Sequence, residues 1–210
     1  MSFNNTSILN DINIEIEDSD FVVITGESGS GKSTLLSILS TLEKPTMGEV
    51  FYDDRAIYKL DEKEISQIRK ESIGIIFQRF YLENEYSVYE NVILPLQFEK
   101  IKKEDKINRA NEVMKKCNIF DKKDEKAKFL SGGEMQRVAI ARALINNPKY
   151  IFADEPCGNL DSKNGFLIMD LFKKLHRDGK TIILVTHNKE HTSYGNKIIE
   201  LKDGEITSRK

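Results

Sequence analysis

The segment from Gly26 to Ser33 has the residue types and spacing of a phosphate-binding loop. It reads Gly-Glu-Ser-Gly-Ser-Gly-Lys-Ser, which matches Gly-x4-Gly-Lys-Ser/Thr in full. Glycines permit backbone conformations that turn successive N–H groups inward, toward phosphate oxygens. A helix that begins near Lys32 would direct its N-terminal dipole at the same anion. The Lys32 ammonium would reach the β- and γ-phosphates, and the Ser33 hydroxyl would ligate Mg²⁺.

The alternative is an accidental match in a flexible Gly/Ser loop. At an average glycine usage of about 7%, such a match is expected in on the order of one chain in a hundred of this length. The loop also follows the apolar run Phe21–Thr25 and precedes leucines and isoleucines at helical spacing over 35–42, as the motif requires. The sequence therefore predicts a phosphate site made by Gly26, Ser28, Gly29, Ser30, Gly31, Lys32, Ser33 and Thr34.

Two adjacent carboxylates, Asp154 and Glu155, follow the apolar run 150–153. Taken alone, a strand followed by Asp-Glu is a common turn. Beside a phosphate loop the pair acquires a chemical use, because Asp154 at the end of a strand can hold the water shell of Mg²⁺. Glu155 would point the other way and could orient or deprotonate an attacking water.

Ser131, Gly132, Gly133 and Glu134 admit two compatible interpretations. Ser131 with Glu134 three residues later is a capping box that opens a helix. Two glycines at that helix N-terminus also leave an exposed anion site. A second cradle without its own lysine has a use if it covers the same ATP from the opposite side. A second copy of the chain, related by a two-fold axis, would provide that arrangement.

Alternating strand and helix patterns predict an α/β fold with a mostly parallel sheet covered on both faces. Further strands are expected at 12–16, 48–52, 73–77 and 181–185, helices at 106–116, 134–145 and 166–175, and a hairpin through 202–204 that forms an antiparallel edge. The segment 83–129 is rich in Lys, Glu and Asn and is expected to form a mainly helical lobe inserted into this core.

Composition narrows the class of protein. The 210 residues suffice for one core, or one core with a smaller lobe, and a formal charge of −2 offers no argument for nucleic-acid binding. The apolar runs are far shorter than the roughly 20 residues of a spanning helix, and the N-terminus lacks the features of a signal peptide. Cys117 and Cys157 belong to no metal-binding or redox motif, so reduced thiols in a cytosolic protein are expected.

Taken together, the motifs resemble the full ordered set of the ABC ATPases. The set comprises the loop at Gly26, Gln78, the segment Leu-Ser-Gly-Gly-Glu-Met-Gln-Arg at 130–137, Asp-Glu-Pro at 154–156, Asn-Leu-Asp at 159–161, and His187. The resemblance covers essentially the whole chain, and the Ser-Gly-Gly signature separates this family from other P-loop proteins. It implies a RecA-like P-loop NTPase core over about 1–82 and 133–210, with an inserted helical lobe over about 83–132.

The resemblance also implies roles for individual residues. Ser131 and Gly133 would bind the γ-phosphate of the other subunit's ATP, Gly132 and Asp161 would belong to the same nucleotide site, and Asp161 would lie at the dimer seam. His187 would hold the γ-phosphate and the attacking water. The implied catalytic set is Glu155, His187, Lys32 and Gln78, and the implied Mg²⁺ set is Ser33, Gln78 and Asp154.

The resemblance is incomplete at two places. Phe3 matches the aromatic residue that stacks on adenine, but most members carry another strand before it; the alternative is a terminal phenylalanine without a ligand. Cys157 occupies a position where close relatives usually have Thr, and both side chains are small.

The segments 77–82, 88–96 and 158–161 are similar to the lipoprotein-releasing, macrolide-efflux and antimicrobial-peptide-export branch. This likeness implies an ATPase homodimer at the inner face of the cell membrane. There it would drive a separate permease, docked near residues 78–82 and the helical lobe, in the export or extraction of a peptide, lipoprotein or drug. The alternative is an ATPase that regulates a membrane protein, in cell-wall or signalling control, without translocating a substrate. A DNA-repair or translation ATPase is disfavoured, because the chain has no sustained heptads and holds only one such domain.

Overall fold

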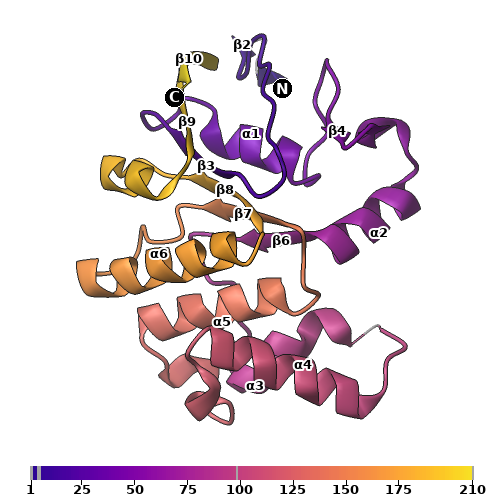
Figure 1. Ribbon diagram of the computed structural model, residues 1–210, viewed down its shortest axis with the longest axis vertical. Coiled ribbons are helices and arrows are strands. Elements are labelled where there is room, and N and C mark those ends of the chain that lie inside the picture. Colours follow the sequence, from indigo (N-terminus) through magenta and orange to yellow (C-terminus); the bar gives the residue numbers. More distant parts are fainter. Residues whose placement is uncertain (1, 4–5, 98, 210) are drawn as a thin grey trace.

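The computed structural model describes the backbone of residues 2–3 and 6–7 and the complete residues 8–97 and 99–209. Within these ranges the main sheet has six strands in the order β10-β9-β3-β8-β7-β6 (Figure 1). Neighbouring strands are parallel from β9 to β6, and only the edge pair β9–β10 is antiparallel. The predicted α/β fold with an antiparallel edge is therefore confirmed. The strands are β3 (Phe21–Thr25), β6 (Ile73–Ile76), β7 (Tyr150–Asp154), β8 (Thr181–Val185), β9 (Lys197–Lys202) and β10 (Glu205–Arg209).

The central strands are apolar throughout because both faces of the sheet are covered. In β3, Val22 and Ile24 pack with α1 (Lys32–Leu39), whereas Phe21 and Val23 face the opposite side. That opposite side is covered by α5 (Gly132–Leu144) and α6 (Ser162–Arg177). Helices α1 and α5 therefore lie on opposite faces of the sheet (Figure 1).

The parallel arrangement brings several functional loops to one edge. Because β3, β6, β7 and β8 run in the same direction, the loops that follow them emerge together at the carboxyl end of the sheet. These loops are the ones that carry the P-loop, Gln78, Glu155 and His187.

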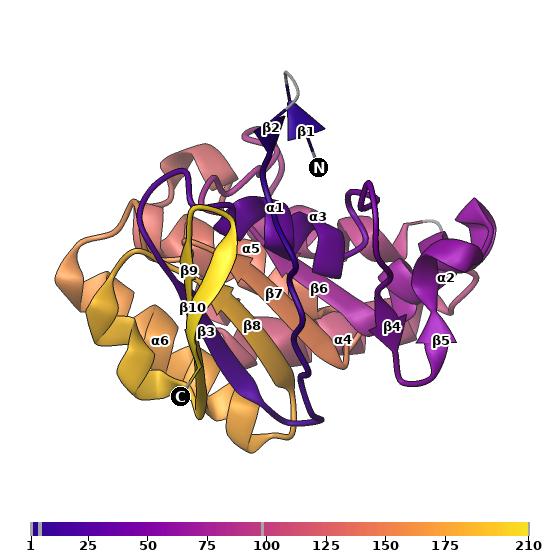
Figure 2. The same ribbon diagram turned by 90° about the horizontal axis from the view of Figure 1, so that it is seen from above.

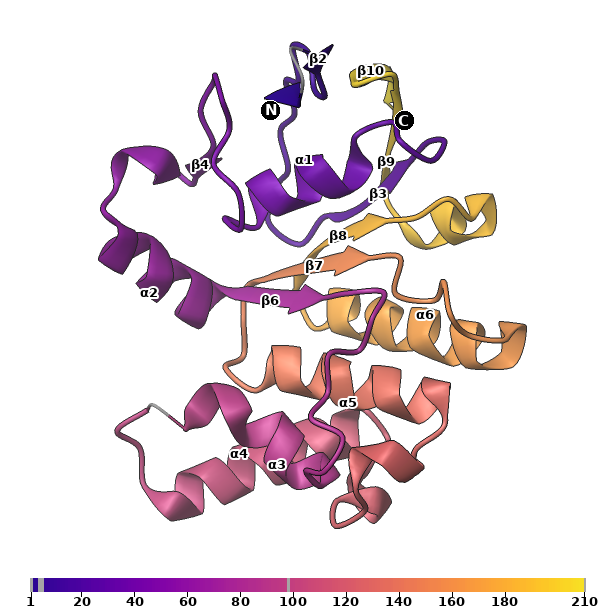
Figure 3. The ribbon, with the colours of Figure 1, turned by 180° about the vertical axis from the view of Figure 1, so that it is seen from behind.

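A group of helices packs against α5 on the side away from the sheet (Figure 3). It comprises α3 (Val88–Ile93), α4 (Lys103–Lys116) and the short 3-10 turns Leu94–Leu96, Phe120–Lys122 and Ala127–Phe129. Val88, Ala110 and Met114 are fully buried and belong to the same apolar cluster as the sheet residue Ile151. This cluster runs without a break from the helical lobe to the sheet, so the packing marks no boundary between them. The division of the chain at residues 83 and 132 therefore stays a prediction.

Two expected strands differ from the prediction. Residues 12–16 alternate in exposure as expected, yet they join no strand ladder. Their carbonyls instead accept from side chains, since Lys197 donates to Glu15 at 3.1 Å and Arg209 donates to Asn13. The strand expected at 48–52 shortens to β4 (Phe51–Tyr52), which pairs with β5 (Arg55–Ala56). Figure 2 shows this small hairpin beside α2, and it forms a two-stranded sheet of its own.

Several elements had no counterpart in the prediction, among them β5 and the 3-10 turn Ile57–Lys59. A short hairpin joins β1 (Ser2–Phe3) to β2 (Thr6–Ser7), and a 3-10 helix spans Lys189–Tyr194. Helix α2 (Glu62–Ser72) begins at a capping box between Asp61 and Glu64 and buries only Ile65. In the described part of the chain, no helix is long and apolar enough to cross a membrane.

Candidate active site

The P-loop is held in its shape by glycine at positions where a side chain cannot fit. Gly26 has φ 152°, and a Cβ there would lie 2.1 Å from the carbonyl oxygen of Leu201. Gly31 has φ 97° and precedes Lys32, the first residue of α1. The sequence between β3 and α1 therefore forms the predicted strand–loop–helix, with the helix N-terminus opening onto the loop.

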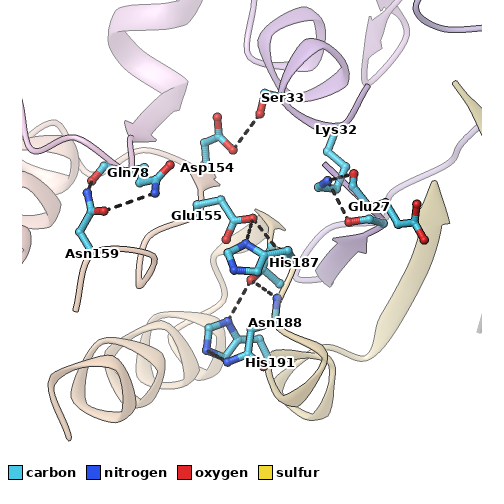
Figure 4. Close-up of polar contacts among 12 residues, drawn as sticks. Glu27, Lys32, Ser33, Gln78, Asp154, Glu155, Asn159, His187, Asn188 and His191 are labelled. Carbon is cyan, nitrogen blue, oxygen red and sulfur yellow. Dashed lines mark hydrogen bonds and ion pairs between the residues drawn. The ribbon is translucent and has the colours of Figure 1, made fainter. Parts of the chain in front are cut away.

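Lys32 is a buried cation held by its own loop. The residue is 7% exposed, and Nζ donates to the carbonyl oxygens of Gly26, at 3.0 Å, and Glu27, at 2.6 Å (Figure 4). Nearby, the buried Ser30 hydroxyl has no hydrogen-bond partner among the described residues. A buried ammonium held by carbonyl dipoles, beside an unpartnered hydroxyl, suits an incoming phosphate. Thr34 follows on α1, and Ser28 and Gly29 form the exposed tip of the loop.

Ser33 and Asp154 meet across the sheet edge. The Ser33 hydroxyl donates to Asp154 Oδ1 at 3.1 Å, although the two residues are 121 positions apart. Burial raises the pKa of the Asp154 carboxyl, the Ser33 hydrogen bond opposes that rise, and the nearby Glu155 charge adds to it. A hydroxyl and a carboxylate are hard oxygen donors of the kind that Mg²⁺ prefers, and a dication would favour the ionised form of Asp154.

Glu155 and His187 form a close pair. Glu155 Oε1 accepts from the His187 backbone N–H at 2.8 Å and contacts the ring Nδ1 at 2.7 Å (Figure 4). The Glu155 side chain is 16% exposed and that of His187 68%. Glu155 has a left-handed backbone, φ 46°, and its N–H donates to the Val185 carbonyl at 3.0 Å. Left-handed backbone at a residue other than glycine costs energy and is concentrated at functional sites.

Gln78 is joined to the loop after Glu155 rather than lying free. Its amide Nε2 donates to Asn159 Oδ1 at 3.4 Å, and Asn159 Nδ2 donates to the Gln78 carbonyl at 3.1 Å. A Cβ at Gly158 would lie 2.8 Å from Gln78 Nε2, so this contact is tight. The sequence placed Asn159 within a motif but gave no reason to expect a partner 81 positions away.

The Ser-Gly-Gly segment lies on the other side of the sheet from its own P-loop. Ser131 caps α5 in the predicted capping box, with its hydroxyl 2.7 Å and its N–H 2.8 Å from Glu134 Oε2. A Cβ at Gly133 would lie 2.3 Å from Asn164 Oδ1, because α5 begins directly against the start of α6. Asp161 caps α6 by accepting from the Asn164 N–H at 2.9 Å. Two adjacent helix N-termini, those of α5 and α6, thus carry Ser131, Gly132, Gly133 and Asp161. These residues do not cover the P-loop of their own chain, Gly26–Ser33.

Phe3 is the one predicted site residue whose side chain lies outside the described part of the chain. Its backbone pairs with Thr6 in the β1–β2 hairpin. Stacking of Phe3 on adenine therefore stays a prediction.

The order and geometry of these loops agree with the comparison with known families. A family model described as ABC transporter matches residues 9–158. The chain belongs to the ABC transporter family. It is the ATP-binding subunit of such a transporter, and the P-loop NTPase fold predicted for it is confirmed.

Several relatives of this ABC subunit match along nearly its whole length. An uncharacterised ABC transporter ATP-binding protein of Methanocaldococcus jannaschii, MJ1508, is 48% identical over 96% of this chain and 90% of its own. The lipoprotein-releasing system ATP-binding protein LolD of Leptospira interrogans is 43% identical over 100% and 88%. The macrolide export ATP-binding/permease protein MacB of Campylobacter fetus is 44% identical over 97% of this chain and 32% of its own. The likeness to this branch is confirmed.

Solved structures support the enzymatic activity of the ABC subunit. A dimeric structure of the ABC transporter cassette MJ0796 superposes with TM-score 0.88, at 46% identity, over 97% of this chain and 90% of that one. The same cassette is known as a dimer in a post-hydrolysis state bound to ADP and Pi, with TM-score 0.88 and 45% identity. The chain is accordingly an ATPase.

Replacing Cys157 by Thr is expected to change ATP turnover by less than about tenfold. The Cys157 thiol is half-buried and donates to the Gly165 carbonyl at 3.6 Å. Burial raises its pKa to about 12, so little of the reactive thiolate is present at neutral pH. A threonine hydroxyl can make the same hydrogen bond, and its extra methyl group is small. Steady-state ATPase rates of the two proteins test this; a change of tenfold or more would show that the thiol itself matters.

Proposed function

We propose that two copies of this chain close around two ATP molecules and that this closure drives a separate membrane permease. The observation that carries the proposal is the position of the Ser-Gly-Gly segment, an open helix N-terminus on the opposite face of the sheet from its own phosphate loop. A second copy, turned head to tail, can bring that helix N-terminus to the ATP held by the first. The dimeric structures of MJ0796, one of them bound to ADP and Pi, support the formation of a dimer.

In the proposed site, the phosphates of ATP bind to the backbone N–H groups of Gly26–Gly31, with Lys32 on the β- and γ-phosphates. Ser33, Asp154 and Gln78 would hold Mg²⁺. When bound, Mg²⁺ neutralises charge that develops on the transferring phosphoryl group. The Ser33–Asp154 contact at 3.1 Å supports this set, because both oxygens already lie together beside the loop.

Hydrolysis in this proposal requires a base and stabilisation of negative charge. Glu155 accepts a proton from water as the water oxygen bonds to the γ-phosphorus and the bond to the β-phosphate oxygen breaks. Lys32 of the copy that binds the ATP and Ser131 of the second copy stabilise the equatorial oxygens of the transferring phosphoryl group. His187 contacts Glu155 through Nδ1, and its side chain is 68% exposed, so the other ring nitrogen, Nε2, is the one proposed to face the γ-phosphate, to which it would donate as N–H.

The proposed permease contact is the segment 78–82 together with the helical lobe. Tyr81 is 62% exposed with φ 48°, and Arg142 fixes the segment by donating to the carbonyls of Phe80, at 2.9 Å, and Tyr81, at 2.6 Å. An exposed aromatic ring on a fixed segment suits a protein interface. The Gln78–Asn159 hydrogen bonds join this segment to the loop after Glu155, which provides a path between docking and hydrolysis.

The proposed task is export or extraction of a peptide, lipoprotein or drug, with the subunit held by its permease at the inner face of the cell membrane. The support comes from the relatives, since LolD belongs to a lipoprotein-releasing system and MacB exports macrolides.

Affinity capture from membranes of the source organism tests this proposal. The Glu155→Gln protein loaded with ATP is expected to recover one permease, and a Glu155→Gln/Tyr81→Glu double variant is expected to lose it, because a carboxylate replaces the exposed ring. Ribosomes or DNA in place of any membrane protein would contradict the proposed partner. Transport of labelled substrate in vesicles then separates a transporter from an ATPase that only regulates its membrane protein.

A further inference from the structure

A second histidine, His191, packs directly behind the turn that carries His187. Its Nδ1 lies 3.2 Å from the Thr186 hydroxyl and its Nε2 lies 3.4 Å from the Asn188 side-chain nitrogen (Figure 4). Its backbone N–H also donates to the Asn188 carbonyl at 3.2 Å. One imidazole ring therefore contacts both residues that flank His187.

The neighbours of His191 determine which ring nitrogen carries the proton. Asn188 Oδ1 accepts from the Glu190 backbone N–H at 2.9 Å as the cap of the 3-10 helix Lys189–Tyr194, so the orientation of the amide is fixed. Its Nδ2 is then a donor, and His191 Nε2 must accept. The proton of neutral His191 consequently resides on Nδ1 and is donated to the Thr186 hydroxyl oxygen.

This arrangement fixes the turn in which His187 meets Glu155. The Thr186 side chain is buried and its oxygen also accepts from the Asn188 backbone N–H at 3.1 Å. With Thr186 and Asn188 both held, the His187 N–H points at Glu155 Oε1, 2.8 Å away. The conformation of the turn thus depends on the His191 ring, although none of these hydrogen bonds joins His191 to Glu155.

We propose that His191 is a positioning residue for hydrolysis, which in its neutral form locks the turn 186–188 and holds His187 on Glu155, and which releases that turn when it is protonated. The inference rests on the proposed roles of Glu155 and His187. Protonation would place an N–H at Nε2 against the amide N–H of Asn188, so two donors would face each other. Rotation of the amide would relieve this conflict only by removing the cap from Glu190.

The charges around His191 set the direction of the pH dependence. Burial lowers its pKa, the carboxylates of Glu155 and Glu190 oppose this, and His187 adds to it. Asp161 and Tyr194 line the same cleft as these residues. Because the folded pKa lies below the ordinary value, the folded protein favours the neutral ring, and the locked turn is lost as pH falls below that value.

The first test is the tautomer, read by nitrogen NMR of the full-length protein. The chain has three histidines, and His176 provides an internal reference because its Nε2 lies 2.7 Å from the Ser19 carbonyl, which can only accept. His176 is expected to carry its proton on Nε2 and His191 on Nδ1. A His191 resonance with the proton on Nε2 would overturn the inference without any activity measurement.

The second test is the pH profile of ATP turnover. His191→Leu removes both side-chain hydrogen bonds and is expected to lower kcat by about tenfold at pH 8, with KM nearly unchanged. His191→Asn retains an N–H near the Nδ1 position without titrating, so turnover at pH 8 is expected to stay within about threefold of wild type. At pH 6 this variant is expected to retain about threefold more of its pH 8 rate than wild type does.

Controls separate this inference from the proposed function. His176→Asn removes a histidine on α6, away from the turn, and is expected to leave the pH profile unchanged. Two results together would contradict the positioning role: His191→Asn loses turnover between pH 8 and pH 6 as wild type does, and His191→Leu keeps the wild-type kcat. This conclusion would hold even when Glu155→Gln is inactive. If Glu155→Gln turns over ATP normally, the proposed catalytic site itself is wrong.

Discussion

Replacing Glu155 by Gln is expected to lower ATP turnover by about 10²–10⁴-fold while ATP binding and dimer closure persist. The amide has nearly the same shape, and its oxygen can still accept the His187 N–H that now lies 2.8 Å from Oε1. It cannot take a proton from water at neutral pH. The local turn is therefore preserved while the base is removed, and the closed, ATP-loaded dimer accumulates.

Single-turnover hydrolysis and the mass of the ATP-loaded particle in solution measure the two halves of this result. Glu112→Gln, the same substitution at an exposed carboxylate on α4, serves as the control and is expected to match wild type. Turnover of Glu155→Gln near the wild-type rate would exclude Glu155 as the base.

Replacing Ser131 by Asp is expected to lower turnover by about 100-fold or more without loss of helix α5. Aspartate is as good an N-cap as serine, and this chain already uses the pair Asp61 and Glu64 as the capping box of α2. The new carboxylate, however, would face the γ-phosphate of the other subunit's ATP. Repulsion between the two anions should then prevent closure while the P-loop still binds nucleotide.

Nucleotide titration, melting temperature and turnover together identify this outcome. The matched control is the reverse exchange at the other capping box, Asp61→Ser, which is expected to leave all three close to wild type. A Ser131→Asp protein that hydrolyses ATP at the wild-type rate would show that this helix N-terminus does not approach phosphate.

The fold could be predicted where the sequence dictates burial. The strands at Phe21–Thr25 and Thr181–Val185 were predicted with their observed bounds. Each has an uninterrupted run of four apolar residues beside one threonine, which suits a central strand of a parallel sheet. The P-loop was equally recognisable, because each glycine and Lys32 has a separate physical requirement. Since parallel strands end at one edge, Asp154 could also be expected near Ser33, and it lies there.

The remainder depends on contacts that no local pattern reveals. Helix α2 is mostly polar and buries only Ile65, so its apolar face is limited to Ile65 and the partly buried Ile68, and the spacing of Asp61 and Glu64 is its capping signal. The hydrogen bonds between Gln78 and Asn159 join segments 81 positions apart. The sequence gives no reason to single out His191, because only the folded chain brings its ring into contact with both Thr186 and Asn188.

The most direct test of the shared site is a mixture of two inactive proteins, Glu155→Gln and Ser131→Asp. If each ATP lies between the P-loop of one copy and the Ser-Gly-Gly segment of the other, a mixed dimer has one site with both defects and one with none. About half of randomly formed dimers are mixed, so the mixture is expected to recover up to about a quarter of the wild-type rate. The double variant mixed with Glu155→Gln is the control, since every site in that mixture lacks the Glu155 carboxylate and no recovery is expected. A rate no higher than that of the two proteins measured separately would mean that the site is not shared between copies.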